Sequence, residues 1–293
     1  MEIRVLKYFL AVAREQSISA AADSLFLSQP TLSRQLKELE EELGKQLFIR
    51  GNRKITLTEE GVLLRKRAEE IMELINRTEK EIGFSDNDIS GDIYIGAGET
   101  DGLRIIARSA KELREKHQDI KFHIISGDAV DIMERLDKGL IDFALLLEPV
   151  DISKYSYIKL PVKDTWGVLM RRDSPLAKKD FITPEDLNGV PLIVSRQASD
   201  GSELTNWLKS GKGEPEIAAT YNLVYNASLM VDEGIGAALC LDKIINVTGE
   251  IGLCFRPLSP RLEIGMSLVW KKGQVFSKAA EQFIIKLKDD IYE

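Results

Sequence analysis

The spacing of apolar residues divides the chain into two parts. Up to about residue 83, apolar side chains recur every three or four positions, which is the period of an amphipathic helix. From residue 91 to the end, short apolar runs typical of strands alternate with helical stretches. The run G-F-S-D-N-D-I-S-G at residues 83–91 separates the two parts and predicts a flexible boundary.

The first part predicts two helices on either side of a tight turn. After a helix over residues 1–16, Ser19 is a candidate N-cap for a short helix that ends near Leu25. Ser28 is a candidate N-cap for a longer helix, which ends at Gly44. The longer helix is expected to bury a stripe of four residues and to leave polar side chains on its opposite face. The stripe consists of Leu32, Leu36, Leu39 and Leu43.

A hairpin is expected after Gly44. Two strands, residues 46–50 and 53–57, flank a turn at Gly51 and Asn52. Three cations lie at the tip of this hairpin, where they suit contact with nucleic-acid phosphates. These cations are Arg50, Arg53 and Lys54.

These motifs resemble the winged helix-turn-helix of the LysR-type transcriptional regulators. The matching runs are A-A-x-x-L at residues 21–25, S-Q-P-T-L-S-R-Q-L-K-E-L-E at 28–40, E-L-G-K-Q-L-F-I-R at 42–50 and L-T-E-E-G at 57–61. So many fixed spacings weigh against the alternative, a helical hairpin in an unrelated core whose charges only face solvent.

The resemblance and the polar face near a helix start predict that the longer helix enters the major groove of double-stranded DNA. Two copies in a dimer would enter successive major grooves of an imperfect palindrome. The residues expected to contact DNA are Ser28, Gln29, Pro30, Thr31, Ser33, Arg34 and Lys37 on the helix, and Arg50, Arg53 and Lys54 on the hairpin.

The net charge of −7 is unusual for a DNA-binding protein, but it is unevenly distributed. Residues 1–58 hold nine Lys/Arg and seven Asp/Glu, so their net charge is +2. Residues 59–88 hold five basic and nine acidic side chains, and residues 89–293 hold 26 and 31, which gives −4 and −5. A small local patch of cations predicts weak non-specific binding, and dimerisation would double its phosphate contacts.

A long helix is expected to begin after Thr58, with Glu59 and Glu60 in its first turn, where acidic residues are favourable. Six positions spaced four and three apart form a heptad seam on it: Leu64, Ala68, Ile71, Ile75, Thr78 and Ile82. The seam either packs on its own protein or pairs two subunits. We favour dimerisation, because the helix directly follows the DNA-binding motif and because the resemblance implies a linker helix that pairs subunits.

The second part predicts an α/β fold. Strands are expected near residues 92–97, 120–126, 141–147, 164–171, 191–195, 217–221, 235–241, 253–258 and 264–271. Helices are expected over residues 100–116, 130–138, 184–188, 202–209, 227–233 and 277–291. The order βαβαβ at the start predicts parallel strands.

Two α/β lobes in one chain resemble the periplasmic-binding-protein-like effector domain of the LysR family. The runs L-I-D-F-A-L-L at residues 140–146 and D-E-G-I-G-A-A-L at 232–239 are similar to runs in that family. The predicted fold class is therefore α/β with an N-terminal winged helix-turn-helix and a two-lobed effector domain.

The expected domains are a DNA-binding domain at residues 1–58, a linker helix and hinge at 59–90, and the effector domain at 91–293. Crossovers near Pro161–Val162 and Leu262–Ile264 would divide the effector domain. Lobe I would hold residues 91–161 and 265–293, and lobe II residues 162–264.

Four polar loops are expected to border a small-molecule site between the lobes, because ligands of open α/β sheets bind beyond the carboxyl ends of strands. The alternative is that Thr100, Asp128 and Asn226 are helix caps only, and each one alone is better explained as a cap. The four loops together favour a pocket. The expected effector contacts are Gly98, Thr100, Ser126, Gly127, Arg196, Gln197, Ser199 and Asn226.

The charges near these loops bear on the chemistry of the ligand. The resemblance implies that effectors are often small carboxylates, yet Glu99, Asp101 and Asp128 add negative charge here. The hypothesis is an effector that is neutral, zwitterionic or cationic, unless Arg196 anchors a carboxylate. Isothermal titration of the Arg196→Ala variant against such a ligand tests the anchor, and unchanged affinity would remove that role.

Other functional classes find little support in the sequence. The chain has two histidines, His117 and His123, and it lacks the common nucleophile-elbow, metalloprotease and P-loop motifs. Cys240 and Cys254 lie in apolar runs, so buried thiols are favoured over a redox pair. Neither a membrane-spanning run nor a secretory signal is found, so a cytoplasmic location is expected.

The predicted function is that of a DNA-binding transcriptional regulator controlled by a small-molecule effector, acting without catalysis, cofactor or metal. Its expected partners are an imperfectly palindromic duplex operator, the effector and further copies of the chain in a dimer or tetramer, with RNA polymerase as a further candidate. The alternative is a cytoplasmic small-molecule-binding module or enzyme with no role in gene regulation. The resemblance implies that lobe closure shifts the dimers within a tetramer and alters the DNA bend.

Overall fold

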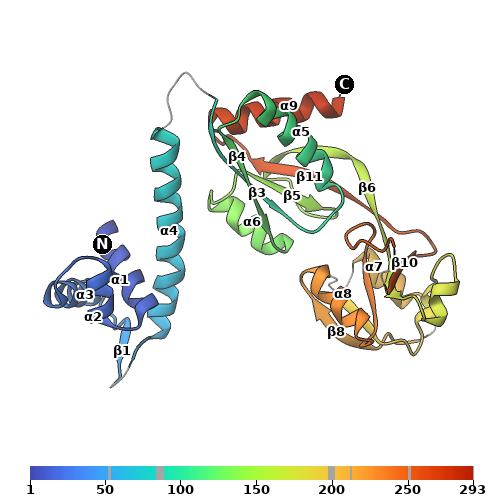
Figure 1. Cartoon of the computed structure of the whole chain (residues 1–293), viewed down its shortest axis with the longest axis horizontal. Helices are drawn as coiled ribbons and strands as arrows, with labels where there is room; N and C mark the ends of the chain where they lie inside the picture. Colours follow the sequence, from blue (N-terminus) through green and yellow to red (C-terminus); the bar gives the residue numbers. More distant parts are fainter. Residues whose placement is uncertain (52–53, 84–88, 197–201, 212, 250–251, 293) are drawn as a thin grey trace. The chain divides into compact units, whose positions relative to one another are not determined.

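The structure is a computed structural model that describes residues 1–51, 54–83, 89–196, 202–211, 213–249 and 252–292. The chain folds as two compact units, Met1–Ser85 and Asp86–Glu293. Figure 1 shows the mainly helical first unit and the mixed α/β second unit.

The first unit is built around a helical core. Its helices are α1 (Ile3–Glu15), α2 (Ile18–Ser24), α3 (Gln29–Leu43) and α4 (Glu59–Gly83), and β1 (Phe48–Arg50) pairs antiparallel with β2 (Ile55–Leu57). Three of the four predicted stripe positions on α3 are buried in this core, while Leu43 is exposed. The core residues include Phe9, Val12, Ala21, Ala22, Leu32, Leu36, Leu39, Leu47 and Ala68.

Polar caps fix the helix boundaries of this unit. The Ser28 Oγ accepts a hydrogen bond from the N–H of Thr31 at 3.3 Å, which confirms the predicted start of α3. Gly44 ends α3 with a left-handed φ of 65°, as expected for a C-cap glycine. The prediction for α2 was wrong, because Ser17 rather than Ser19 is its N-cap. Ile18 already packs against the core, so the helix begins one residue before Ser19.

The heptad seam of α4 is divided between two environments. Its first positions, Leu64, Ala68 and Ile71, pack into the core of their own unit. Ile82, at the far end of the seam, is 79% exposed. The first half of the seam therefore packs on its own protein and holds α4 against α1, whereas the favoured role of the helix in dimerisation stays a prediction.

The second unit is organised around one extended sheet. The strand order is β4-β3-β5-β11-β6-β9-β7-β8, and β10 pairs with β6 outside this path. The strands are β3 (Gly91–Ala97), β4 (Ile120–Ser126), β5 (Phe143–Leu147), β6 (Tyr155–Arg171), β7 (Leu192–Ser195), β8 (Ile217–Tyr221), β9 (Ala237–Leu241), β10 (Leu253–Pro257) and β11 (Glu263–Lys271). The helices are α5 (Leu103–Lys116), α6 (Ala129–Asp137), α7 (Glu203–Lys209), α8 (Val224–Asp232) and α9 (Lys278–Tyr292), with short 3-10 helices at Pro175–Lys178 and Pro184–Leu187. The predicted parallel pairing is confirmed, because β3 runs parallel to both β4 and β5.

The long strand β6 connects two halves of this unit. Its residues up to Thr165 pair with β11, and its residues from Trp166 onward pair with β9. This exchange of partners lies a little beyond the predicted crossover at Pro161–Val162. We call the half with β3, β4, β5, α5, α6 and α9 the first lobe, and the half with β7, β8, β9, β10, α7 and α8 the second lobe.

Each lobe has helices on both faces of its sheet. In the first lobe, α5 and α9 cover one face and α6 the other (Figure 1). Successive side chains of β5 point to opposite faces of the sheet, so Phe143 packs with α9 on one face and Ala144 packs with α6 on the other. In the second lobe, Val168 and Leu169 of β6 likewise face the cores beneath α7 and α8. The four predicted site loops leave from the carboxyl ends of β3, β4, β7 and β8.

Candidate functional site

The N-terminal half of α3 presents polar side chains to solvent. Gln29, Pro30, Arg34 and Lys37 are exposed, while Thr31 and Ser33 are half-buried. The hydroxyls of Ser28 and Thr31 lie 2.8 Å apart, so both also belong to the helix cap. This face therefore combines a firmly capped helix start with side chains that can donate to base edges or phosphates.

Two cations of this face form solvent-exposed ion pairs along the helix. Arg34 Nε lies 3.7 Å from Glu38 Oε1, and Lys37 Nζ lies 3.3 Å from Glu41 Oε1. Exposed pairs of this kind contribute only about 0–1 kcal/mol. Both cations can therefore exchange their carboxylate partners for phosphates at little cost.

The hairpin is tied to α3 by a carboxylate. Glu40 Oε1 accepts hydrogen bonds from the N–H groups of Leu47 at 2.7 Å and Phe48 at 3.2 Å, where the chain enters β1. Arg50 is the last residue of β1, and Lys54 is exposed just before β2. Arg53 and the side chain of Arg50 lie outside the described residues. The strands are shorter than predicted, and Glu40 has a positioning role that the helical charge pattern did not indicate.

An exposed aromatic residue stands beside this face. Phe26 lies in the turn between α2 and α3, with a left-handed φ of 55° and 97% of its surface exposed. A bulky residue in this backbone region is uncommon. Sequence periodicity did not single out Phe26, because a large apolar residue in a helical segment is normally expected to be buried.

Two of the four predicted site loops lie side by side in the first lobe. A Cβ built on Gly98 would lie 4.0 Å from the carbonyl oxygen of Gly127, and the N–H of Gly127 donates to Ala97 at 3.2 Å. Ser126 is exposed beside them. Asp128 caps α6 by accepting from the N–H of Asp131 at 2.9 Å, so its role as a cap is confirmed.

Thr100 connects the first of these loops to β6. Its hydroxyl donates to the carboxylate of Asp164 and accepts from the N–H of Gly102 at 3.0 Å. Asp164 is only 7% exposed, and its burial is the main cause that raises the pKa of its carboxyl, with the nearby charge of Asp101 adding to it. The prediction that Thr100 begins α5 was wrong, because Gly102 is the N-cap.

The fourth loop differs from the prediction. Helix α8 begins at Val224, so Asn226 is its third residue and is exposed, rather than its cap. The N–H of Val224 donates instead to the carboxylate of Glu99, from the loop after β3. The loops of the first lobe and the start of α8 are thus in direct contact.

The third loop is described only at its ends. The side chain of Arg196 is exposed, and its backbone N–H donates to the carbonyl of Tyr221 at 2.8 Å. Ser202 caps α7 by accepting from the N–H of Thr205 at 3.1 Å. Gln197 and Ser199 lie outside the described residues, so their expected effector contacts stay predictions.

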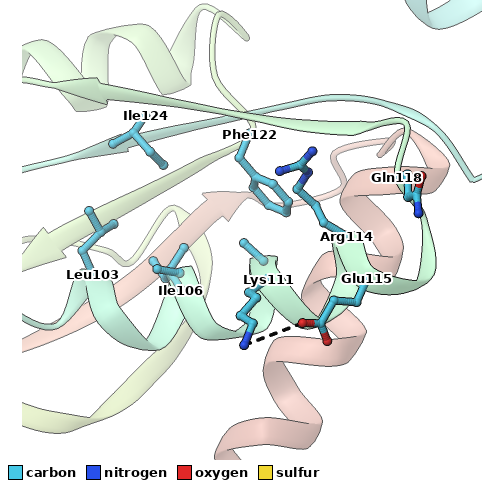
Figure 2. Close-up of a pocket in the computed structure, with 10 residues that line it drawn as sticks. Leu103, Ile106, Lys111, Arg114, Glu115, Gln118, Phe122 and Ile124 are labelled. Carbon is cyan, nitrogen blue, oxygen red and sulfur yellow. Dashed lines mark ion pairs between the residues drawn. The ribbon is translucent and has the colours of Figure 1, made fainter.

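A groove of about 590 Å³ lies elsewhere in the first lobe, between α5 and β4. Figure 2 shows its apolar lining of Leu103, Ile106, Phe122 and Ile124. Lys111 and Glu115, whose charged atoms are 3.6 Å apart, stand at its rim (Figure 2). Because β4 ends the strand order, the groove follows an edge of the sheet.

The two cysteines of the chain are both buried in the second unit. Cys240 and Cys254 are both buried and free of any disulfide, and burial raises the pKa of the Cys240 thiol to about 12. A thiol with such a pKa stays protonated at neutral pH and is a poor nucleophile. Across the described ranges, no group of three or more His, Cys, Asp or Glu side chains could hold a metal ion.

None of the described helices is both long and apolar enough to cross a lipid bilayer.

Two family models together match nearly the whole chain. Residues 3–62 match the bacterial regulatory helix-turn-helix proteins of the lysR family, and residues 86–291 match the LysR substrate binding domain. The chain belongs to the LysR family of transcriptional regulators.

Full-length relatives share this organisation. The HTH-type transcriptional regulator YfeR of Shigella flexneri is 27% identical, over 95% of this chain and 91% of its own length. The Hca operon transcriptional activator HcaR of Escherichia coli K12 is also 27% identical, over 94% and 93%. The crystal structure of full-length CbnR with its target DNA has the same fold, with a TM-score of 0.78 at 20% identity over 99% of this chain and 100% of CbnR.

Membership of the LysR family assigns a function to each unit. The first unit is a DNA-binding helix-turn-helix, and the second is a domain that responds to an effector. The two residues that join the candidate effector loops, Glu99 and Asp164, were not among the predicted site residues. Both make their contacts across the fold to residues far away in the chain. The surplus of acidic residues near the loops included Glu99, whereas no sequence signal pointed to Asp164.

Proposed function

We propose that this LysR-family regulator reads its operator with the N-terminal half of α3 and responds to an effector bound at the loops around Gly98, Thr100 and Gly127. The DNA-binding role is supported mainly by the arrangement of α3, which has a buried apolar face and a solvent-exposed polar face on opposite sides. The stripe of Leu32, Leu36 and Leu39 is buried, and this leaves the polar side chains at the helix start facing solvent. This is the arrangement by which a recognition helix enters a major groove.

Arg34 is our candidate for direct readout of a base. A guanidinium can donate two hydrogen bonds to the O6 and N7 of guanine. The Arg34→Ala variant is therefore expected to bind its preferred duplex more weakly by roughly 1–3 kcal/mol, with little change on random duplex. The preferred duplex can be selected from a random-sequence library with the full-length chain, and affinities then measured by fluorescence anisotropy.

The matched control is Arg14→Ala. Arg14 is an arginine of the same 71% side-chain exposure on α1, paired with Glu15 at 2.9 Å. Arg14→Ala is expected to leave sequence preference unchanged. A uniform loss of affinity for Arg34→Ala on every duplex would make Arg34 a phosphate contact. If the full-length chain enriches no duplex from the library, the proposed function itself is wrong.

We propose that the operator is an imperfect palindrome bound by a homo-oligomer. Two surfaces support self-association. One is the second half of α4, which carries the exposed Ile82, and the other is the apolar groove between α5 and β4 with the exposed Ile124. A sedimentation mass of one chain at micromolar concentration would contradict this proposal.

The proposed regulator acts on DNA in the cytoplasm and without catalysis. Its effector is a small molecule whose binding favours one of two arrangements of the lobes, because a ligand shifts an equilibrium only through different affinities for its states. Relatives such as HcaR, an activator of the Hca operon, support a regulatory rather than an enzymatic role.

A further inference from the structure

The second-lobe helix α8 is capped by a side chain of the first lobe. The carboxylate of Glu99, in the loop after β3, accepts a hydrogen bond from the N–H of Val224, the first residue of α8. Leu223, at the N-cap position itself, makes no side-chain cap bond. The free N–H groups at a helix start favour an anion. Glu99 supplies that anion from across the lobes.

The position of this carboxylate coincides with the candidate effector site. Burial is the main cause that raises the pKa of Tyr221, the last residue of β8, and that of Cys240 in β9, and the nearby charge of Glu99 adds a smaller contribution to both. Next to it in the chain, Thr100 holds the carboxylate of Asp164. A helix start at the carboxyl ends of strands is where an α/β protein binds an anionic ligand group. Here that place holds a group of the protein itself.

We propose that Glu99 is a built-in occupant of the α8 N-terminus that joins the lobes and determines which effector charge is accepted. With Glu99 in place, a carboxylate effector cannot use the N–H of Val224 and is repelled by Glu99, Asp101 and Asp164. A ligand with an ammonium or amidinium group is attracted by the same carboxylates. The selection of effector charge rests on the proposed effector function, whereas the contact of Glu99 with α8 between the lobes does not.

The test is rescue of a truncated side chain by a free carboxylate. The Glu99→Ala variant of the full-length protein is expected to unfold about 2–4 °C lower in its second unit, as for the loss of one helix cap in a unit of this size. Sodium acetate should restore the midpoint in a saturable manner, because acetate can occupy the vacated position at α8. Sodium chloride at the same ionic strength should not, and the wild type should respond equally to both salts.

Two further variants separate a specific site from general effects. Asp101→Ala removes a neighbouring carboxylate that pairs with Arg104 in its own lobe at 2.6 Å, and it is expected to show no response to acetate. Glu99→Gln keeps an acceptor of similar size, so it should lose less stability and bind no acetate. It also provides a readout if Glu99→Ala does not fold.

An unchanged midpoint in Glu99→Ala, no saturable rescue, or equal stabilisation of the wild type by acetate would each overturn the proposal. Because these measurements use the protein without DNA, they leave the DNA-binding function to be judged by duplex selection. The two proposals therefore fail separately.

Discussion

Replacing Phe9 by alanine is expected to abolish operator binding while leaving the second unit folded. Phe9 is fully buried on α1, and its ring centroid lies 5.2 Å from that of Phe48, the first residue of β1. Truncation of a buried Phe costs about 3–5 kcal/mol, against a typical total stability of about 5–15 kcal/mol. The cavity would undermine both α3, whose Leu36 shares this core, and the hairpin.

The matched variant is Phe283→Ala, which makes a cavity of the same kind in the other unit. Phe283 is also fully buried, with ring centroids 5.4 Å from Phe143 and 5.3 Å from Phe122. Differential scanning calorimetry of the full-length chain should show a lower melting temperature for the first unit in Phe9→Ala and for the second unit in Phe283→Ala. Only the Phe9 variant should lose duplex binding through unfolding of the first unit. A shift of both transitions by either variant would contradict the independence of the two units.

Local sequence signals predicted most of the helices and strands, and the failures have identifiable causes. The predicted strand at residues 164–171 missed the first half of β6, because Pro161 lacks a backbone N–H and normally ends a central strand. In the fold, Pro161 lies opposite a register irregularity, since Lys159 pairs with Ser267 and Lys163 with Gly265. The extra residues lie in β6 itself, which bulges at the proline opposite Met266 of β11, and the pattern of a single segment cannot reveal this.

Whether the start of a helix was predicted correctly depended on whether its capping group lies next to it in the sequence. Ser28, Thr58 and Asp128 cap their helices from the adjoining position, and each was identified from the sequence. Helix α8 has no such residue before it, and its prediction began too late, at residue 227. The cap comes from Glu99, which is 125 positions away in the chain. A rule that examines the preceding residue cannot find a group delivered by the other lobe.

The same distinction applies to the functional sites. The proposed DNA-binding face of α3 lies on one continuous segment, so helical spacing predicted the burial of Leu32, Leu36 and Leu39 opposite it, although Leu43 is exposed. The effector loops come from separate strands, and their contacts depend on how the sheet brings the strands together. The seam of α4 could pack either on its own unit or on a second subunit. Leu64, Ala68 and Ile71 pack into the core of their own unit. Sequence spacing alone identifies an apolar face but not the surface that it meets.

The glycine of the L-T-E-E-G motif illustrates how closely the hairpin and α4 approach. A Cβ built on Gly61 would lie 2.2 Å from the carbonyl oxygen of Leu47 and 3.2 Å from the Cβ of Leu57. Leu47 O already accepts the N–H of Thr58 at 3.0 Å, so this backbone cannot move away freely. We therefore expect Gly61→Ala to destabilise the first unit by about 1–3 kcal/mol, the usual cost of overpacking, and to displace the hairpin from its proposed phosphate contacts.

The control for this prediction is at the other end of the same helix. A Cβ built on Gly83 would have no neighbouring heavy atom within 4 Å. Because alanine favours a helix over glycine by about 1 kcal/mol, the Gly83→Ala variant should be as stable as the wild type or slightly more stable. Urea unfolding and salt-dependent duplex binding measure both effects. Because the hairpin is proposed to contact phosphates, Gly61→Ala should weaken binding to all duplexes alike and reduce the dependence of affinity on salt. A Gly61→Ala variant with wild-type stability would show that α4 and the hairpin are not held as closely as the structure indicates.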